Sequence, residues 1–145
     1  MGKTAVVYWS GTGNTEAMAK AITEGLKSEN SENSEVTLYN VSEITAEQAL
    51  GFERLILGCP SMGAEVLEEM EFDPFFSDIE KGLSGKKVAL FGSYGWGDGE
   101  WMRDWQSRTE AAGASLFEEG LIINETPSED DLAQCAQFGA RFSRF

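Results

Sequence analysis

The stretch Ala5-Val6-Val7-Tyr8-Trp9, followed by Ser10-Gly11-Thr12-Gly13-Asn14-Thr15, decides the fold of this 145-residue chain. Five apolar residues in a row are typical of a buried strand, and the glycine-containing turn behind them leads into a segment with helical periodicity. A strand, a tight turn and a helix N-terminus in this order bind a phosphoryl group through backbone N–H groups, helped by the positive end of the helix dipole.

The side chains of this turn are all neutral. Ser10, Thr12, Asn14 and Thr15 carry hydroxyls or an amide, and the turn contains no Lys, Arg or His. A nucleoside triphosphatase loop reads G-x-x-x-x-G-K-[ST] and places its Lys on the β- and γ-phosphates. The turn therefore favours one terminal phosphate that is bound and not transferred, which indicates a phosphomonoester cofactor. Helix capping by Thr12 or Asn14 is the structural alternative.

Length and charge limit the remaining possibilities. The chain has the size of one domain over residues 1–145, and its 11 basic and 25 acidic residues give a net charge of -14. So acidic a protein is a poor ligand for nucleic acid or anionic membranes, because both need cationic patches. Basic proteins that bind transiently are the expected partners, steered by charge.

Targeting and redox signals are few. No apolar run approaches the ~18 residues that span a bilayer, and no signal peptide is evident. Cys59 and Cys135 lack the C-x-x-C spacing of a redox pair or a metal site. We therefore expect a cytoplasmic monomer without a bound metal.

Apolar runs alternate with helical patterns along the whole chain. We expect strands at 3–9, 35–40, 54–58, 87–92 and 115–123, helices at 14–27, 73–82, 100–113 and 128–142, a polar turn at 28–34 and a loose helical stretch near 45–50. Alternation of buried strands and helices predicts an α/β fold, a doubly wound five-stranded parallel sheet with helices on both faces. The strand order 2-1-3-4-5 places a ligand site at the carboxyl ends of strands 1, 3 and 4.

Two further loops reach that edge of the sheet. The first begins Cys59-Pro60-Ser61-Met62-Gly63-Ala64-Glu65, and the second reads Ser93-Tyr94-Gly95-Trp96-Gly97-Asp98-Gly99. A Trp between two glycines is exposed rather than packed in a core, and a large exposed ring needs a flat partner. Met62 suits the other face of an aromatic system because its sulfur is polarizable. The loops predict a slot for a planar heterocycle, with Glu65 accepting from a ring imide N–H.

Three motifs resemble the short-chain flavodoxins of anaerobic bacteria. They run from Tyr8 to Glu16, over Leu57-Gly58-Cys59-Pro60 with Met62-Gly63, and from Lys86 to Gly97 in the order Lys-Lys-Val-Ala-Leu-Phe-Gly-Ser-Tyr-Gly-Trp-Gly. The resemblance covers nearly the whole chain and implies the flavodoxin-like fold. It also implies noncovalent FMN in a flavoprotein of electron transport, which is not an enzyme but a low-potential one-electron carrier that works through a neutral semiquinone.

The resemblance also assigns cofactor-binding residues. Ser10, Thr12, Asn14 and Thr15 would bind the FMN phosphate, with Trp9 nearby. Some relatives carry a Ser at the position of Pro60, so one phosphate hydroxyl is either absent from this chain or supplied by Ser61. Met62 and Trp96 would sandwich the isoalloxazine, Glu65 would meet ring N3, and Gly63, Gly95 and Gly97 would meet the ring edge. The remaining members of the predicted site are Gly11, Gly13, Ala64, Ser93, Tyr94 and Asp98.

Two expectations concern the redox chemistry. In the family the peptide after Gly63 turns its carbonyl toward flavin N5, so we expect a Gly63–Ala64 flip on reduction, in a four-residue turn with positive φ at Gly63. An acidic rim around the flavin should disfavour the second electron and attract basic partners. Its expected members are Glu65, Glu68, Glu69, Glu71, Asp73, Asp98 and Glu100.

Three other classes of protein fit parts of the pattern. An FMN-dependent quinone or flavin reductase would need a substrate or nicotinamide site, and no basic pocket residues mark one. A receiver-type signalling domain needs an acidic pair after strand 1 and a Lys after strand 5, where this chain has Trp9-Ser10 and Ile123-Asn124. A nucleotide-binding module without redox activity would leave Trp96 unexplained.

Overall fold

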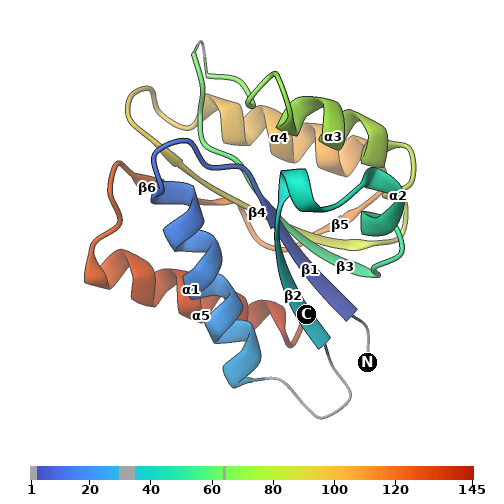
Figure 1. The fold of residues 1–145 in the computed structure, drawn as a ribbon, viewed down its shortest axis with the longest axis horizontal. Coiled ribbons are helices and arrows are strands. Elements are labelled where there is room, and N and C mark those ends of the chain that lie inside the picture. The colour runs from blue at the N-terminus through green and yellow to red at the C-terminus, as the bar shows by residue number, and fades with distance from the viewer. Residues whose placement is uncertain (1–2, 30–34, 64) are drawn as a thin grey trace.

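Strands and helices alternate in the computed structural model, which describes residues 3–29, 35–63 and 65–145 (Figure 1). The strands are β1 (Lys3–Tyr8), β2 (Glu35–Asn40), β3 (Arg54–Gly58), β4 (Lys87–Tyr94), β5 (Ser115–Leu116) and β6 (Leu121–Asn124). The helices are α1 (Asn14–Ser28), α2 (Ala46–Ala49), α3 (Phe72–Glu80), α4 (Glu100–Ala111) and α5 (Glu129–Phe142), with a 3-10 turn at Val41–Glu43. The predicted alternation is confirmed. Most of the predicted polar turn at 28–34 lies outside the described residues.

Every strand pairing in the sheet is parallel, in the order β2-β1-β3-β4-β5, and β6 also pairs with β4. This confirms the predicted topology. The fifth position is filled by two short strands rather than by one strand over 115–123. Two features divide it: Glu118 has a φ of 49°, and an added Cβ on Gly120 would lie 2.2 Å from the sulfur of Met102. Between β5 and β6 the chain thus passes close to Met102 of α4.

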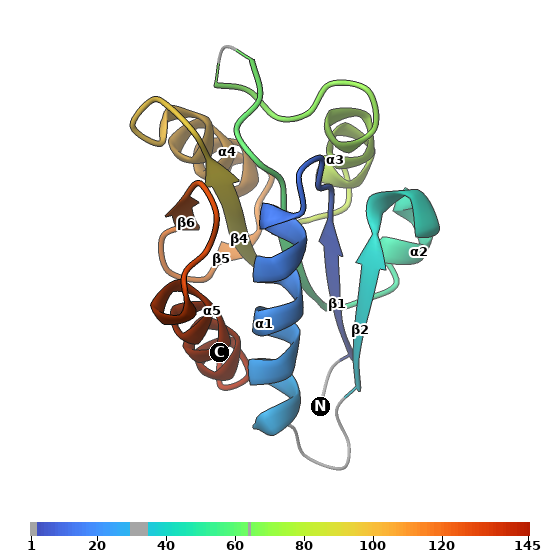
Figure 2. The ribbon, with the colours of Figure 1, turned by 60° about the vertical axis from the view of Figure 1, so that its left-hand side comes forward.

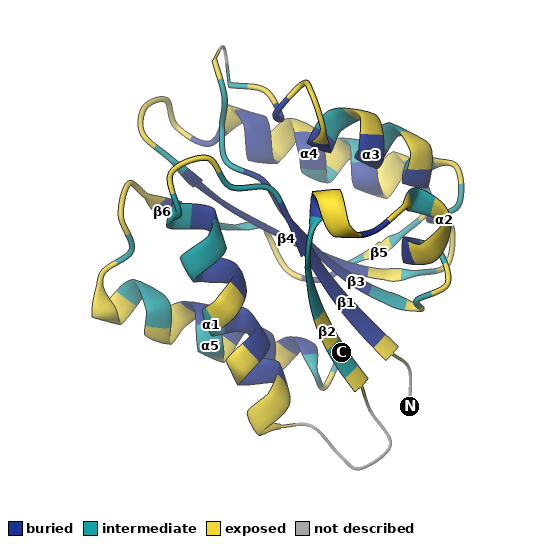
Figure 3. Cartoon of the chain, viewed as in Figure 1, coloured by how far each residue is buried: buried dark blue, intermediate teal, exposed yellow. Residues whose placement is uncertain are grey.

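Helices cover both faces of the sheet, because alternate residues of each strand point to opposite sides. On one face, Val7 and Leu57 pack with side chains of α3 and α4, including Trp105. On the other face, Val6 and Phe91 pack with α1 and α5. Figure 3 shows the buried residues of α1, α3 and α4 on the sides that face the sheet. The sheet is therefore doubly wound, as predicted.

Helices α1 and α5 pack with almost no space between their backbones. An added Cβ on Gly25 would lie 1.9 Å from the carbonyl oxygen of Ala136, and one on Gly139 would lie 2.2 Å from that of Ile22. Real Cβ atoms do not approach this closely, so both positions require glycine. The close pair holds the C-terminal half of α1 against α5.

The strands end at one side of the molecule. In Figure 2 the arrowheads of β1, β2 and β4 all point toward the same end, where the chain leaves the sheet in loops. Parallel sheets bind ligands outside these carboxyl ends, where the strand order reverses. Here the reversal lies between β1 and β3.

Candidate functional site

A cavity of about 390 Å³ lies at the carboxyl ends of β1, β3, β4 and β6. It is lined by Trp9, Ser10, Gly11, Thr12, Asn14, Thr15, Pro60, Ser61, Met62, Ser93, Tyr94, Gly95, Trp96, Glu125 and Thr126. The three predicted loops therefore meet at one cavity. Of the predicted site residues, Gly13, Gly63, Glu65, Gly97 and Asp98 are not part of its lining, and Ala64 lies outside the described residues.

The loop before α1 presents open backbone donors. Gly13 has a φ of 97°, which lets the chain turn into the helix at Asn14. The Ser10 hydroxyl accepts from the N–H groups of Gly13 at 3.1 Å and Glu16 at 3.3 Å. Within the described part of the chain, the N–H groups of Thr12, Asn14 and Thr15 have no protein acceptor. Free N–H groups at a helix N-terminus form an anion site.

Two side chains of this loop have structural contacts as well. The Thr15 hydroxyl is buried and lies 2.8 Å from the hydroxyl of Ser93, which ties α1 to β4. A hydroxyl has one donor and two lone pairs, so this single bond leaves Thr15 both its hydroxyl and its N–H for a ligand. The Trp9 ring lies over Gly11, where an added Cβ would come within 2.9 Å of it. Glycine at this position lets the indole close over the loop.

The Ser61 hydroxyl supports the presence of a bound group. Ser61 lines the cavity, and its N–H donates to the carbonyl of Ser93 at 3.0 Å. Its Oγ is buried and has no hydrogen-bond partner among the described residues. Buried hydroxyls are normally bonded, so this one fits a ligand oxygen. Ser61 is one of the two alternatives that the sequence leaves open for the hydroxyl at the position of Pro60.

Met62 and Trp96 come from different loops and both line the cavity. The Trp96 side chain is 62% exposed, which is unusual for so large a ring. Met62 exchanges two backbone hydrogen bonds with Val66, at 2.9 and 3.0 Å. These bonds close a turn from Met62 to Val66, which is one residue longer than the predicted four-residue turn. Gly63 has the predicted positive φ, at 48°. The Gly63–Ala64 peptide lies outside the described residues.

Glu65 is held by the start of α4. One carboxylate oxygen accepts the N–H of Glu100 at 2.8 Å. The other lies where an added Cβ of Gly97 would approach within 2.1 Å. Because α4 begins at a glycine without a side-chain cap, the carboxylate satisfies an N–H that the helix leaves free.

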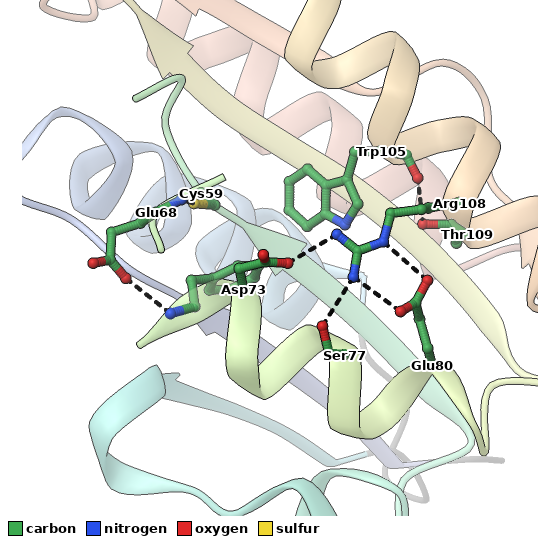
Figure 4. A network of polar contacts seen from close by, with 9 residues as sticks. Cys59, Glu68, Asp73, Ser77, Glu80, Trp105, Arg108 and Thr109 are labelled. Carbon is green, nitrogen blue, oxygen red and sulfur yellow. Dashed lines mark hydrogen bonds and ion pairs between the residues drawn. The ribbon is translucent and has the colours of Figure 1, made fainter. Parts of the chain in front are cut away.

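The predicted acidic rim is wrong for Glu68, which is only 6% exposed. Its carboxylate accepts the N–H groups of Met70 at 2.9 Å, Glu71 at 2.7 Å and Phe72 at 2.9 Å. These groups belong to the chain just before and at the start of α3, whose own N-cap has no side-chain bond. Glu68 is therefore a structural cap rather than a surface charge. Figure 4 shows it beside Cys59, whose sulfur accepts the Glu68 N–H.

Two other rim acids are paired with arginines. Asp73 accepts from Arg108 at 2.9 Å, and Arg108 also bonds Glu80 between α3 and α4 (Figure 4). These carboxylates raise the pKa of Arg108 above its ordinary value. Asp98 pairs with Arg103 at 2.9 Å, and this partner lowers the pKa of the Asp98 carboxyl. Neither Asp73 nor Asp98 acts as an uncompensated charge.

Glu125 and Thr126 were not among the predicted site residues, although both line the cavity. Glu125 has a φ of 57°, and its N–H donates to the carbonyl of Tyr94 at 2.7 Å. The signal was available, because these residues follow the last strand at the same edge of the sheet. The sequence around Pro127 is typical of the beginning of the last helix as well as of a loop at the site.

A larger hollow of about 710 Å³ lies at the opposite edge of the sheet. Its four cations already have partners: Arg144 pairs with the Glu29 carboxylate, and the other three donate to backbone oxygens. Lys86 donates to the carbonyls of Leu50 and Phe52, and Lys87 and Arg54 both donate to that of Phe145. These bonds hold chain segments together, and the loops with the predicted chemistry do not reach this hollow.

Comparisons with known proteins agree with this geometry. The family model described as Flavodoxin matches residues 6–139. A flavodoxin of Clostridium beijerinckii is 48% identical over 138 residues, covering 95% of this chain and 97% of that protein. A flavodoxin of Megasphaera elsdenii is 45% identical over 136 residues, covering 92% and 93%. The solution structure of two-electron reduced Megasphaera elsdenii flavodoxin has a TM-score of 0.86 and 42% identity, covering 98% and 99%.

These matches confirm the predicted fold and FMN as the cofactor. They also exclude the reductase, receiver and simple nucleotide-binding alternatives, because flavodoxins transfer electrons and are not enzymes. The chain belongs to the flavodoxin family and is an FMN-binding electron carrier of the short-chain type.

Proposed function

We propose that this flavodoxin shuttles single electrons between partner proteins at low potential, through a neutral semiquinone of FMN. The observation that carries the proposal is the charge of the cavity wall. No Lys or Arg is among the lining residues of the described chain, and Glu125 is. The phosphate therefore keeps its negative charge uncompensated beside the ring.

The backbone supplies the phosphate site in this proposal. In it the free N–H groups of Thr12, Asn14 and Thr15 bind the phosphate, with the Ser61 hydroxyl as a further donor. Hydrogen bonds to charged groups contribute about 1.5–3 kcal/mol each. Several of them bind a phosphate firmly without a cation. Residues 1–145 act as one FMN-binding unit.

The ring is held between two side chains. Met62 and Trp96 line the cavity from opposite loops and provide the two faces of the slot. Glu65 lies outside the cavity lining, beside Gly97, and in this proposal it turns the carboxylate oxygen that the N–H of Glu100 does not use toward ring N3. The Gly63 carbonyl accepts from reduced N5, and the positive φ at Gly63 supports that part of the proposal.

The electrostatics favour a low potential. FMN accepts two electrons in succession, and the fully reduced ring is an anion next to the phosphate. Arg103 and Arg108 are paired with carboxylates and leave little positive charge to offset it. Each tenfold change in a one-electron equilibrium corresponds to about 59 mV. Many small repulsions therefore add up to a measurable lowering of the reduction potential.

The partners in this proposal are basic redox proteins that bind transiently to a monomer of net charge -14. We also place the protein in the cytoplasm. Cys59 and Cys135 are both buried free thiols, and burial raises the pKa of Cys135 to about 12. Such thiols resist oxidation and suit a reducing compartment. None of the described helices has the length and apolar character to cross a membrane.

Two measurements on the purified protein test the proposal. The first compares the Kd values of FMN and riboflavin by quenching of flavin fluorescence. We expect FMN to bind at least about 100-fold more tightly, because riboflavin cannot use the phosphate donors. The second follows the absorbance spectrum during stepwise reduction, where a blue neutral semiquinone should accumulate. Equal Kd values would refute the phosphate site. Reduction in one two-electron step would refute the semiquinone.

A further inference from the structure

Three large hydrophobic side chains of the described chain are exposed: Val66 at 41%, Trp96 at 62% and Met70 at 84%. Trp96 lines the cavity, where a flavin face would cover it. Val66 and Met70 lie on the segment between Met62 and α3, and neither lines that cavity. Met70 is the most exposed of the three, and the proposed cofactor site gives it no partner.

The exposure of Met70 comes from a well-fixed backbone. Its N–H donates to the buried carboxylate of Glu68 at 2.9 Å, and the next two N–H groups bond the same carboxylate. Upstream, Met62 and Val66 form a two-way hydrogen-bonded pair. Leu67 and Phe72 on either side are buried in the core. The Met70 side chain is therefore exposed to solvent on a segment whose backbone is already fixed by hydrogen bonds.

The surroundings of Met70 are negative and close to the cavity. Glu69 and Glu71 flank it, both are exposed, and neither has a cation within 4 Å among the described residues. The Glu71 carboxylate accepts the indole N–H of Trp9 at 3.2 Å, and Trp9 lines the cavity. A protein that binds Met70 would therefore lie beside the proposed flavin site.

We propose that Met70 is the apolar anchor of the docking surface for redox partners, and that those partners carry an apolar recess ringed by Lys or Arg. This rests on the basic partners of the proposed function. An exposed side chain on an ordered backbone binds at low entropic cost. Methionine is flexible and polarizable, so one anchor can fit recesses of different shape, which suits a carrier with several partners. Glu69 and Glu71 supply the complementary charge.

The test measures electron transfer from the reduced FMN protein to a basic cytochrome c whose exposed haem edge is ringed by lysines. Stopped-flow rates are taken from low to high ionic strength for the parent and for Met70→Ser, Met70→Leu and Glu69→Gln. We expect Met70→Ser to lower the second-order rate constant about threefold or more even at high salt, where steering is screened. Met70→Leu should restore it. Glu69→Gln should flatten the salt dependence instead.

Two controls isolate the anchor. Hexaamminecobalt(III), a small cation without a recess, should be reduced equally fast by parent and Met70→Ser. Glu24→Gln makes the same charge change as Glu69→Gln on α1, which covers the other face of the sheet from α3 and α4. Its effect on the salt dependence should be smaller than that of Glu69→Gln. FMN affinity should be the same in all variants.

The outcomes separate this inference from the proposed function. If the parent reduces the cytochrome and Met70→Ser matches it at every ionic strength, the anchor is refuted while the carrier function stands. Equal slowing with hexaamminecobalt(III) would also refute it, because the change would then act on the flavin. If the parent does not reduce the cytochrome at all, the proposed function fails, and the anchor fails with it.

Discussion

Removing the Glu68 side chain should lower the free energy of unfolding more than the loss of any other charged side chain between Met62 and α3. The carboxylate accepts three backbone N–H groups at 2.7 to 2.9 Å, and Phe72 at the start of α3 is fully buried. Glu68→Ala leaves all three donors unbonded. Loss of a helix cap costs about 0.5–2 kcal/mol, and each unsatisfied buried donor about 1–3 kcal/mol. The bonds from Met70 and Glu71 are only part-buried, so their freed N–H groups can bond water in the variant, and we expect a total loss of about 2–4 kcal/mol.

Glu68→Gln should lose about half as much. One carboxylate oxygen accepts from Glu71 and Phe72, and the other accepts only from Met70. The glutamine amide keeps one oxygen to accept from Glu71 and Phe72. Its NH2 group is a donor and cannot accept the N–H of Met70. Glu69→Ala is the matched control, because Glu69 is the adjacent residue, carries the same charge, is exposed and forms no ion pair among the described residues.

Urea unfolding of the FMN-free proteins, followed by circular dichroism, provides the measurement. Cofactor is omitted because a ligand bound to the native state would add its own stabilisation. With an m-value of about 2 kcal/mol/M, Glu68→Ala should move the midpoint down by about 1–2 M. Glu68→Gln should fall between that variant and the control. Identical midpoints for Glu68→Ala and Glu69→Ala would refute the capping role, and Glu68 would then be a rim charge as the sequence predicted.

Three further changes have defined expectations. Trp96→Ala should weaken FMN binding by about 1–3 kcal/mol, the range for stacking on a nucleobase, as read from flavin fluorescence; an unchanged Kd would remove Trp96 from the site. Gly63→Ala should cost about 1 kcal/mol through its φ of 48° alone, because nothing lies within 4 Å of an added Cβ, and should lower the semiquinone yield in a dithionite titration. Gly139→Ala should destabilise by about 1–3 kcal/mol in urea despite the higher helix propensity of alanine, because the new methyl meets the Ile22 carbonyl; a stabilised variant would contradict the close α1–α5 contact.

The fold and the location of the site could be predicted because both follow from local patterns and general topology. Runs such as Ala5–Tyr8 identify buried strands, and right-handed crossovers then leave few strand orders. Once the order is known, the loops after β1, β3 and β4 must meet. The same reasoning applied to the last strand would have added Glu125. That residue was missed because only the loops after the first, third and fourth strands were expected to form the site.

The roles of single carboxylates could not be predicted in this way. Glu68 and Glu69 are chemically identical neighbours, yet one is buried and the other exposed. The difference depends on how the chain reverses before α3 and brings three N–H groups to one side chain. Glu65 and Glu100 are likewise joined across 35 residues by a hydrogen bond that no sequence pattern marks. The division of the fifth strand depends on a similar distant contact, between Gly120 and Met102.

The segment from Glu65 to Asp73 illustrates why net charge alone is a poor guide to docking. Four of its five acidic residues act within the structure: Glu65 at the start of α4, Glu68 at the start of α3, Glu71 on Trp9 and Asp73 on Arg108. Among the described contacts only Glu69 has no such role, although Glu71 bonds a neutral indole and keeps its charge exposed. The overall charge of -14 can still speed encounter over long range. Selection at contact must then depend on the few groups that remain available to a partner, and on this segment the most exposed of them is the apolar side chain of Met70.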